Sequence, residues 1–359
     1  MASIQILVKP ASGLCNLKCR YCFYCDEMEK RETPSYGFMA EETMEAVIRR
    51  AFAYADERVG FLFQGGEPTL VGLDFYKAVV ALEEKYNRKK IPVTNSIQTN
   101  GMNLTAEWAS FFASHDFLVG ISIDGTKHTH DAFRVDAAGT GTFASVMKTA
   151  ELFEQYGVTY NVLTVVNKRT AVSIPKIYSF YKKNNWKYLQ FIPCLRPMGD
   201  NTQSELYMTA DQYTDFLIRI FNLYVKDFTR GNYMSIRQFD NWVRMYLGER
   251  AEQCGLMGHC THQFVCEGNG NIYPCDFYCT DEWLLGNINE SSLKVLAQSK
   301  TAYEFIKESI PVPEKCKACK FYPLCRAGGC KRNRESGDYC ESYKKFFASC
   351  LPLFRVFRK

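Results

Sequence analysis

The chain has 359 residues, which is enough for one large domain and a smaller one. Charged residues make up 23% of it and the net charge is +5, and no long basic run is present, which argues against nucleic acid as a partner. No run is apolar enough to span a bilayer and no signal peptide is recognisable, so we expect a cytoplasmic protein without a membrane partner.

Short apolar runs rich in β-branched residues alternate with amphipathic stretches over the first 200 residues. The runs predict strands at 4–8, 59–63, 93–97, 117–123, 159–166 and 188–192. The amphipathic stretches predict helices at 40–55, 73–86, 106–114, 142–156 and 173–183. Repeated strand–helix units indicate an α/β fold with a parallel sheet, either a curved, partly open barrel or a doubly wound sheet.

The pattern changes after about residue 193. Helices are predicted at 211–227 and 236–247, and from Cys254 onward the chain is rich in loops and cysteines. This change indicates a second domain, with a boundary near residue 250.

Four polar loops, three of which contain glycine, follow the first four predicted strands. They read CNLKCRYC (15–22), QGGEPT (64–69), QTNG (98–101) and SIDG (122–125). In parallel α/β folds, chemistry collects at the carboxyl ends of the strands. We therefore expect these loops to build one site.

The sixteen cysteines are unusual for a chain of this length. Disulfide scaffolds are usually short, so cysteine clusters in a long cytosolic α/β protein point to metal binding or redox chemistry. Cys15, Cys19 and Cys22 are spaced C-x3-C-x2-C, so three thiolates in one loop would leave one iron of a four-iron cluster open. Spacing alone leaves zinc, completed by a distant residue, as an alternative.

This motif, with Tyr21 before its last cysteine, resembles the signature of the radical S-adenosylmethionine (SAM) enzymes. In that family the open iron binds the amino and carboxyl groups of SAM, and cleavage of SAM yields a 5′-deoxyadenosyl radical. The turn of Gly65, Gly66 and Glu67 is similar to the family's GGEP turn, which holds the methionyl amino group of SAM.

The resemblance implies three further SAM contacts. Ser122 and Arg134 stand where relatives contact the ribose and the carboxylate of SAM. Leu195 matches a backbone contact to adenine. Together with Tyr21 and the glycine turn, these residues form the predicted cofactor site.

Eight C-terminal cysteines form a second group, which is enough for two fully ligated four-iron clusters or, alternatively, for zinc ribbons. The pattern resembles the SPASM extension of radical SAM enzymes, which carries two auxiliary clusters. The resemblance implies one cluster on Cys254, Cys260, Cys275 and Cys330, and another on Cys316, Cys319, Cys325 and Cys340. The spacing around Cys330 and Cys340 departs from the family pattern, so Cys350 is the candidate replacement for either.

Stretches such as KPASGLCNLKCRYCFY, FQGGEPTL, SIRQFDNWV and YPCDFY are similar to the anaerobic sulfatase-maturating enzymes, which oxidise a cysteine or serine of a sulfatase to Cα-formylglycine. The resemblance implies a partial (β/α)6 radical SAM barrel over 1–235 and a SPASM domain with a C-terminal helix over 236–359. It also implies SAM and three [4Fe–4S] clusters as cofactors. The partners would be an unfolded sulfatase or peptide and a low-potential electron donor such as flavodoxin or ferredoxin.

Two alternatives remain at this point. A SPASM enzyme that introduces a thioether, an epimer or a carbon crosslink into a ribosomal peptide would share almost every motif. A zinc-rich binding protein without catalysis belongs to another class.

Asp276, beside Cys275, matches the family's proposed base. A carboxylate within hydrogen-bond reach of the target is what general base catalysis requires. The alternative is an ordinary turn residue. Residues on the strand-end loops and one further candidate are predicted to line a peptide groove: Tyr24, Gln64, Gln98, Asn100 and Arg237.

Overall fold

The computed structural model describes residues 2–200, 204–336 and 339–358, and the chain folds into two units, each assembled from segments far apart in the sequence. The first unit contains Met1–Ser122, Val135–Tyr160 and Thr261–Lys307. The second contains Ile123–Arg134, Asn161–Cys260 and Glu308–Lys359. The predicted domain boundary at 235/236 remains a prediction, because these units are not single stretches of chain.

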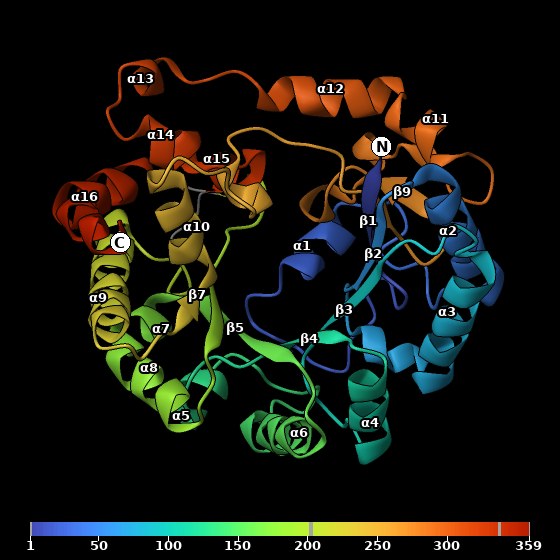
Figure 1. Cartoon of the computed structure of the whole chain (residues 1–359), viewed down its shortest axis with the longest axis horizontal. Coiled ribbons are helices and arrows are strands. Elements are labelled where there is room, and N and C mark those ends of the chain that lie inside the picture. Colours follow the sequence, from blue (N-terminus) through green and yellow to red (C-terminus); the bar gives the residue numbers. More distant parts are fainter. Residues whose placement is uncertain (1, 201–203, 337–338, 359) are drawn as a thin grey trace. The chain divides into compact units, whose positions relative to one another are not determined.

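The first unit is built on four parallel strands (Figure 1). In the order of their pairing they are β1 (Ser3–Val8), β2 (Arg58–Phe63), β3 (Val93–Thr99) and β4 (Leu118–Ser122). The helices are α1 (Phe23–Glu29), α2 (Glu41–Tyr54), α3 (Leu73–Tyr86), α4 (Ala106–Ser114), α6 (Phe143–Tyr156), α11 (Leu293–Ala297) and, up to Lys307, α12 (Lys300–Ser309).

Three short strands extend this sheet beyond β1. They are β8 (Val265–Cys266), β9 (Asn271–Tyr273) and β10 (Gly286–Asn287). β8 pairs parallel with β1, with Cys266 opposite Val8, while the pairs β8–β9 and β9–β10 are antiparallel. The sheet is therefore mixed. β9 runs antiparallel to β1, and Asp276, in the segment that follows β9, lies 3.1 Å from Lys9, the residue after β1.

The second unit has its own parallel strands, β5 (Tyr160–Val166), β6 (Tyr188–Pro193) and β7 (Ser235–Ile236). Its helices are α5 (Lys127–His130), α7 (Lys168–Val172), α8 (Ile174–Lys183), α9 (Ala210–Thr229), α10 (Arg237–Tyr246), α13 (Glu314–Lys317), α14 (Tyr322–Cys325), α15 (Lys331–Ser336) and α16 (Cys340–Cys350). Aromatic side chains of α9, α10 and α16 form its core. The centre of the Phe346 ring lies 5.3 Å from that of Phe221 and 5.0 Å from that of Trp242.

The predicted strands and helices are confirmed to within a residue or two at each end. Their apolar periodicity is a local property; in α2, for example, Met44, Val47, Ile48 and Ala51 are buried on one face. The helix α1 and the short strands β8 to β10 were not predicted, because they are too short to show a period. Within the described residues, no helix combines the length and the apolar character that a bilayer crossing needs.

Candidate active site

The three cysteines of the first motif lie in the loop between β1 and α1 and close to one another. Cys22 N donates to Cys19 O at 3.2 Å, and the charge of Cys19 acts on the pKa of both Cys15 and Cys22. Burial raises the pKa of Cys15 to about 11. Two donors face Cys15 Sγ, Leu17 N at 3.4 Å and Asn100 Nδ2 at 3.7 Å. Such donors favour a thiolate, the form that binds metal, so this loop fits a cluster with three protein ligands.

The GGEP turn packs directly on this cysteine loop. Gly66 N donates to Ser12 O and Glu67 N donates to Leu14 O, both at 2.8 Å. Gly65 has φ +120°, and a Cβ at Gly66 would lie 2.0 Å from Leu14 O. Glycine is therefore needed here because the backbones of the two loops touch, which adds to the predicted approach to SAM.

The Glu67 carboxylate is buried and accepts hydrogen bonds from other residues of the protein. Oε1 accepts from Thr69 N at 3.1 Å, from Thr69 Oγ1 at 2.6 Å and from Thr99 Oγ1 at 2.8 Å, while Oε2 accepts from Asn100 N at 2.7 Å. Burial raises the pKa of Glu67, and these hydrogen bonds oppose that rise. The side chain thus connects the GGEP and QTNG loops; a contact of Glu67 with SAM remains a prediction.

Replacing Glu67 with glutamine should destabilise the protein by about 1–3 kcal/mol, because an amide NH2 group would face buried donors that now have an acceptor. Denaturant unfolding of the anaerobically reconstituted protein measures this difference. Glu84→Gln, on the exposed part of α3, is the matched control and should change the midpoint little. Equal midpoints for the two variants would contradict the role assigned to Glu67.

Three residues predicted separately meet at Asp276. Tyr24 OH donates to Asp276 Oδ2 at 2.9 Å, and Gln64 Nε2 lies 3.1 Å from the same oxygen. Gln64 Nε2 also lies 2.8 Å from Tyr24 OH. Asp276 follows β9, Gln64 follows β2 and Tyr24 lies in the first turn of α1, so the mixed sheet of the first unit brings all three together. Burial raises the pKa of Tyr24 well above its usual value, so the phenol stays protonated and acts as a hydrogen-bond donor.

A buried group of charged and polar residues surrounds this contact, and of its members only Asp276 was predicted from the sequence. We call it the Lys9 cluster; its members are Lys9, Glu27, Arg31, Glu267, Asp276 and Cys279. Lys9 Nζ lies 2.9 Å from Glu27 Oε2, 3.1 Å from Asp276 Oδ1, 3.6 Å from Glu267 Oε1 and 3.2 Å from Cys279 Sγ. The available signal was a lysine placed directly after a strand whose last residues are all apolar.

The charged groups of the Lys9 cluster shift the pKa values of one another. Burial alone lowers the pKa of Lys9, but the acidic groups around it raise the value well above its ordinary range, so the side chain is an ammonium. Burial raises the pKa of Glu27 to about 7, against the opposing effect of Lys9. Burial also acts to raise the pKa of Glu267, but Lys9 and Arg31 hold it below its usual value. Glu27 is therefore a weaker acid than Glu267.

The remaining predicted residues of the first unit lie on neighbouring loops. Gln98 Nε2 donates to Ser122 Oγ at 3.0 Å, and Asn100 Nδ2 donates to Asn16 Oδ1 at 2.8 Å. Asn100 therefore supports the cysteine loop in addition to any contact with a peptide. Tyr21 is partly exposed within that loop.

In the second unit, Arg134 forms a buried ion pair with Asp124, at 3.1 Å from Nε to Oδ2. Leu195 is partly exposed in the loop after β6. Arg237 is exposed at the start of α10, with Nη2 3.8 Å from Glu252 Oε1. Asp124 holds the Arg134 side chain in one orientation, as a predicted carboxylate-binding residue requires.

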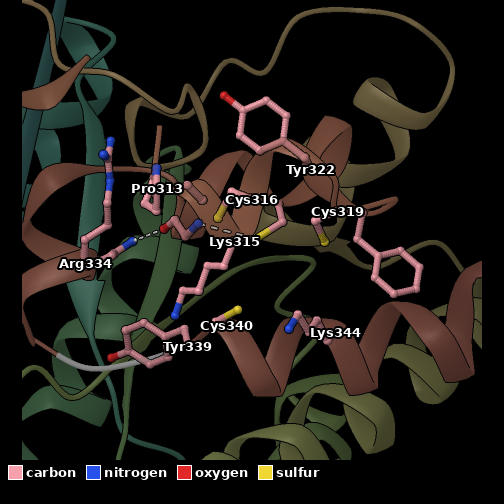
Figure 2. Close-up of a pocket in the computed structure, with 14 residues that line it drawn as sticks. Pro313, Lys315, Cys316, Cys319, Tyr322, Arg334, Tyr339, Cys340 and Lys344 are labelled. Atoms are coloured by element: carbon pink, nitrogen blue, oxygen red, sulfur yellow. Dashed lines mark hydrogen bonds between the residues drawn. The ribbon is translucent and has the colours of Figure 1, made fainter. Parts of the chain in front are cut away.

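Four of the C-terminal cysteines line one cavity in the second unit. Figure 2 shows Cys316, Cys319 and Cys340 turning their sulfur atoms into the same space, and Cys325 completes the set. The cavity has a volume of about 310 Å³. Burial raises the pKa of Cys325 to about 11, and the charges of the other three cysteines add to this effect. Four thiols around one space fit a fully ligated cluster.

Cys254, Cys260 and Cys330 come together elsewhere in this unit. Burial raises the pKa of Cys330, and the charge of Cys260 contributes, so these thiols are close. A Cβ at Gly329 would lie 1.7 Å from Gly255 O, which shows that the glycines before Cys330 let its segment touch that of Cys254. Cys275, the predicted fourth ligand, belongs to the first unit, and its membership in this set remains a prediction.

Replacing Cys340 with alanine should remove about four of about twelve irons, because it deletes one ligand of a four-iron cluster. Cys350→Ala is the matched control: Cys350 is buried at the other end of α16 and is not among the residues lining the cavity. Iron analysis after anaerobic reconstitution measures both. Loss of iron from Cys350→Ala with full iron in Cys340→Ala would show that Cys350 is the ligand.

Comparisons with known proteins agree with this geometry. The Radical SAM superfamily model matches residues 10–181, and the SPASM iron–sulfur cluster-binding domain model matches residues 258–320. These matches define the class as a radical SAM enzyme with a SPASM domain, so SAM and [4Fe–4S] clusters are its cofactors and the zinc interpretation is set aside.

The relatives are more specific. The chain is 45% identical to the cysteine-type anaerobic sulfatase-maturating enzyme of Clostridium novyi, over 97% of this chain and 95% of the relative. It is 44% identical to the cysteine-type enzyme of Clostridium perfringens (98% and 97% covered) and 31% identical to the serine-type enzyme of Bacteroides thetaiotaomicron (99% and 91%). The solved structure of anSMEcpe with bound AdoMet matches with TM-score 0.95 and 42% identity, covering 99% of this chain and 100% of that one.

The chain therefore belongs to the anaerobic sulfatase-maturating enzymes. The predicted fold class, a radical SAM α/β domain followed by a SPASM domain, is confirmed. A structure of SuiB with a precursor peptide, at 20% identity and TM-score 0.64, shares the fold alone.

Proposed function

We propose that this enzyme oxidises a cysteine of an unfolded sulfatase segment to Cα-formylglycine under anaerobic conditions. The contact of Asp276 with Tyr24 and Gln64 carries the proposal, because it supplies a base at the strand ends of the unit that holds the cysteine loop. Cysteine is preferred over serine as the target, because the cysteine-type relatives are 43–45% identical and the serine-type relatives 30–31%.

The residues of this chain fit the iron–sulfur clusters and SAM. Cys15, Cys19 and Cys22 would hold the first cluster, and the GGEP turn, Ser122, Arg134 and Leu195 would bind SAM. The two auxiliary clusters would use Cys254, Cys260, Cys275 and Cys330, and Cys316, Cys319, Cys325 and Cys340. When bound, these groups supply the 5′-deoxyadenosyl radical that removes a Cβ hydrogen, and the acceptors for the second electron.

The chain's own residues handle the proton. Asp276 accepts the proton of the target thiol as its sulfur becomes doubly bonded to Cβ, and water then replaces that sulfur to leave the aldehyde. Tyr24 and Gln64 donate to Asp276 Oδ2, so the carboxylate is oriented before the target arrives. With a serine target, loss of the hydroxyl proton would give the aldehyde directly.

Other parts of the proposal concern partners. The structure of anSMEcpe with bound AdoMet and Cp18Cys peptide, at 41% identity, supports a peptide substrate here. Gln98, Asn100 and Arg237 are proposed to line the groove for it, and flavodoxin or ferredoxin is proposed as the electron donor. None of the sixteen cysteines, all within the described residues, is in a disulfide, which supports a reducing compartment, the cytoplasm.

The test is a sulfatase peptide carrying Cys-x-Pro-x-Arg, incubated anaerobically with SAM and a reductant. We expect 5′-deoxyadenosine and a peptide whose mass has fallen by the difference between CH2SH and CHO. A serine version should react more slowly. For the cysteine peptide, formation of 5′-deoxyadenosine with an unchanged peptide mass, or with loss of two hydrogens alone, would support an epimerising or crosslinking maturase instead.

A further inference from the structure

The Lys9 side chain is buried where a charge is costly. Its exposed fraction is 1%, and its ammonium contacts residues of three separate segments: α1, the residues after β8 and those after β9. Replacing buried ion pairs with apolar residues is often neutral or stabilising, so burial alone gives no reason for a lysine at this position. The reason has to come from what the ammonium contacts.

The other cation of the Lys9 cluster, Arg31, forms ion pairs with the two glutamates. Arg31 lies 2.7 Å from Glu267 Oε1 and 3.2 Å from Glu27 Oε2. Among the ion pairs of the described residues, Asp276 is paired with Lys9, at 3.1 Å from Oδ1, and not with Arg31. Arg31 therefore balances the two glutamates, and the ammonium of Lys9 is what balances Asp276.

The two oxygens of Asp276 have different neighbours. Oδ1 faces the ammonium of Lys9, while Oδ2 accepts the hydrogen bonds of Tyr24 and Gln64. Lys9 Nζ also lies 4.7 Å from the centre of the Tyr24 ring, within the range of a cation–π contact. Lys9 thus contacts both the carboxylate and one of its two donors.

We infer that Lys9 is a positioning residue for peptide oxidation: its ammonium anchors Asp276 Oδ1 and so holds the carboxylate in the orientation in which Tyr24 and Gln64 present it to the target residue. The inference rests on the proposed function, because it assigns Lys9 to the base of that reaction. Nothing in this role requires Lys9 to touch the peptide, SAM or a cluster.

The test is the double variant Lys9→Met/Glu27→Gln. Lys9→Met alone would leave three carboxylates facing Arg31 and would disturb folding. The double variant removes one cation and one carboxylate together, so the formal charge of the Lys9 cluster stays at −1: two cations and three carboxylates become one and two. The control is Lys77→Met/Glu107→Gln, which removes an exposed pair 3.0 Å apart.

We expect the double variant to keep its iron content and its affinity for a fluorescently labelled substrate peptide. Formylglycine formation should fall about tenfold or more, since a displaced catalytic group costs rate rather than binding. The amount of 5′-deoxyadenosine released per formylglycine should rise, because radical formation would continue without a positioned base. The control should match the wild type in both quantities.

Each outcome separates the inference from the proposed function. A double variant with the wild-type rate and the wild-type ratio of the two products would overturn the inference, and so would a loss of peptide affinity that accounts for the whole effect. The ratio is measured on the iron-replete fraction, so partial unfolding does not imitate the result. If Asp276→Asn is inactive while the double variant is normal, the role of Lys9 alone fails; if Asp276→Asn is fully active, the proposed base fails first.

Discussion

Replacing Asp276 with asparagine is expected to lower peptide oxidation about 10²–10⁴-fold, the usual contribution of a positioned general base. Asparagine has nearly the same shape, so the hydrogen bonds around the side chain can largely persist, but an amide cannot take up the proton of the target thiol. SAM binding should be retained, because Asp276 is not among the residues proposed to hold SAM.

The measurement is formylglycine formation by mass spectrometry, alongside SAM binding and iron content. Asp74→Asn is the matched control, since Asp74 lies at the exposed start of α3 with a side chain 96% exposed. A variant Asp276→Asn that oxidises the peptide at the wild-type rate would show that another group is the base.

Replacing Cys15 with alanine is expected to abolish SAM cleavage altogether. The first cluster would have two protein ligands left, so about four of about twelve irons should be lost. The two hydrogen-bond donors at Cys15 Sγ, Leu17 N and Asn100 Nδ2, would also lose their acceptor.

Cys25→Ala is the control for this variant, because Cys25 is an exposed cysteine three residues after the motif. It should keep its iron and its ability to form 5′-deoxyadenosine. If Cys15→Ala still cleaved SAM at the wild-type rate, the assignment of the first cluster to this loop would be wrong.

The two largest effects arise in the same unit. The cysteine loop follows β1, and Asp276 follows β9, which joins β1 through β8. Lys9 is the first residue after β1, and its backbone N–H donates to Cys266 O at 2.8 Å. The predicted radical site and the predicted base therefore both lie near the carboxyl end of β1.

The amino-acid sequence by itself determined the strands β1 to β6, the helices α2 to α4, α6 and α8 to α10, and the first cysteine motif. Each of these depends on residues a few positions apart: a helical period within α2, or three thiols within eight residues. The assignment to radical SAM chemistry followed from such local motifs, and the relatives confirm it.

The tertiary structure decided how distant residues are combined. Tyr24 and Asp276 are 252 residues apart and meet because β8 pairs with β1. The sequence offered Cys350 as a replacement for Cys340. In the structure Cys340 lines the same cavity as Cys316, Cys319 and Cys325 and Cys350 does not, while the ligand set itself remains a prediction. Lys9 has no local pattern to mark it, because a buried ammonium is compensated by carboxylates that the fold alone delivers, from positions 27, 267 and 276.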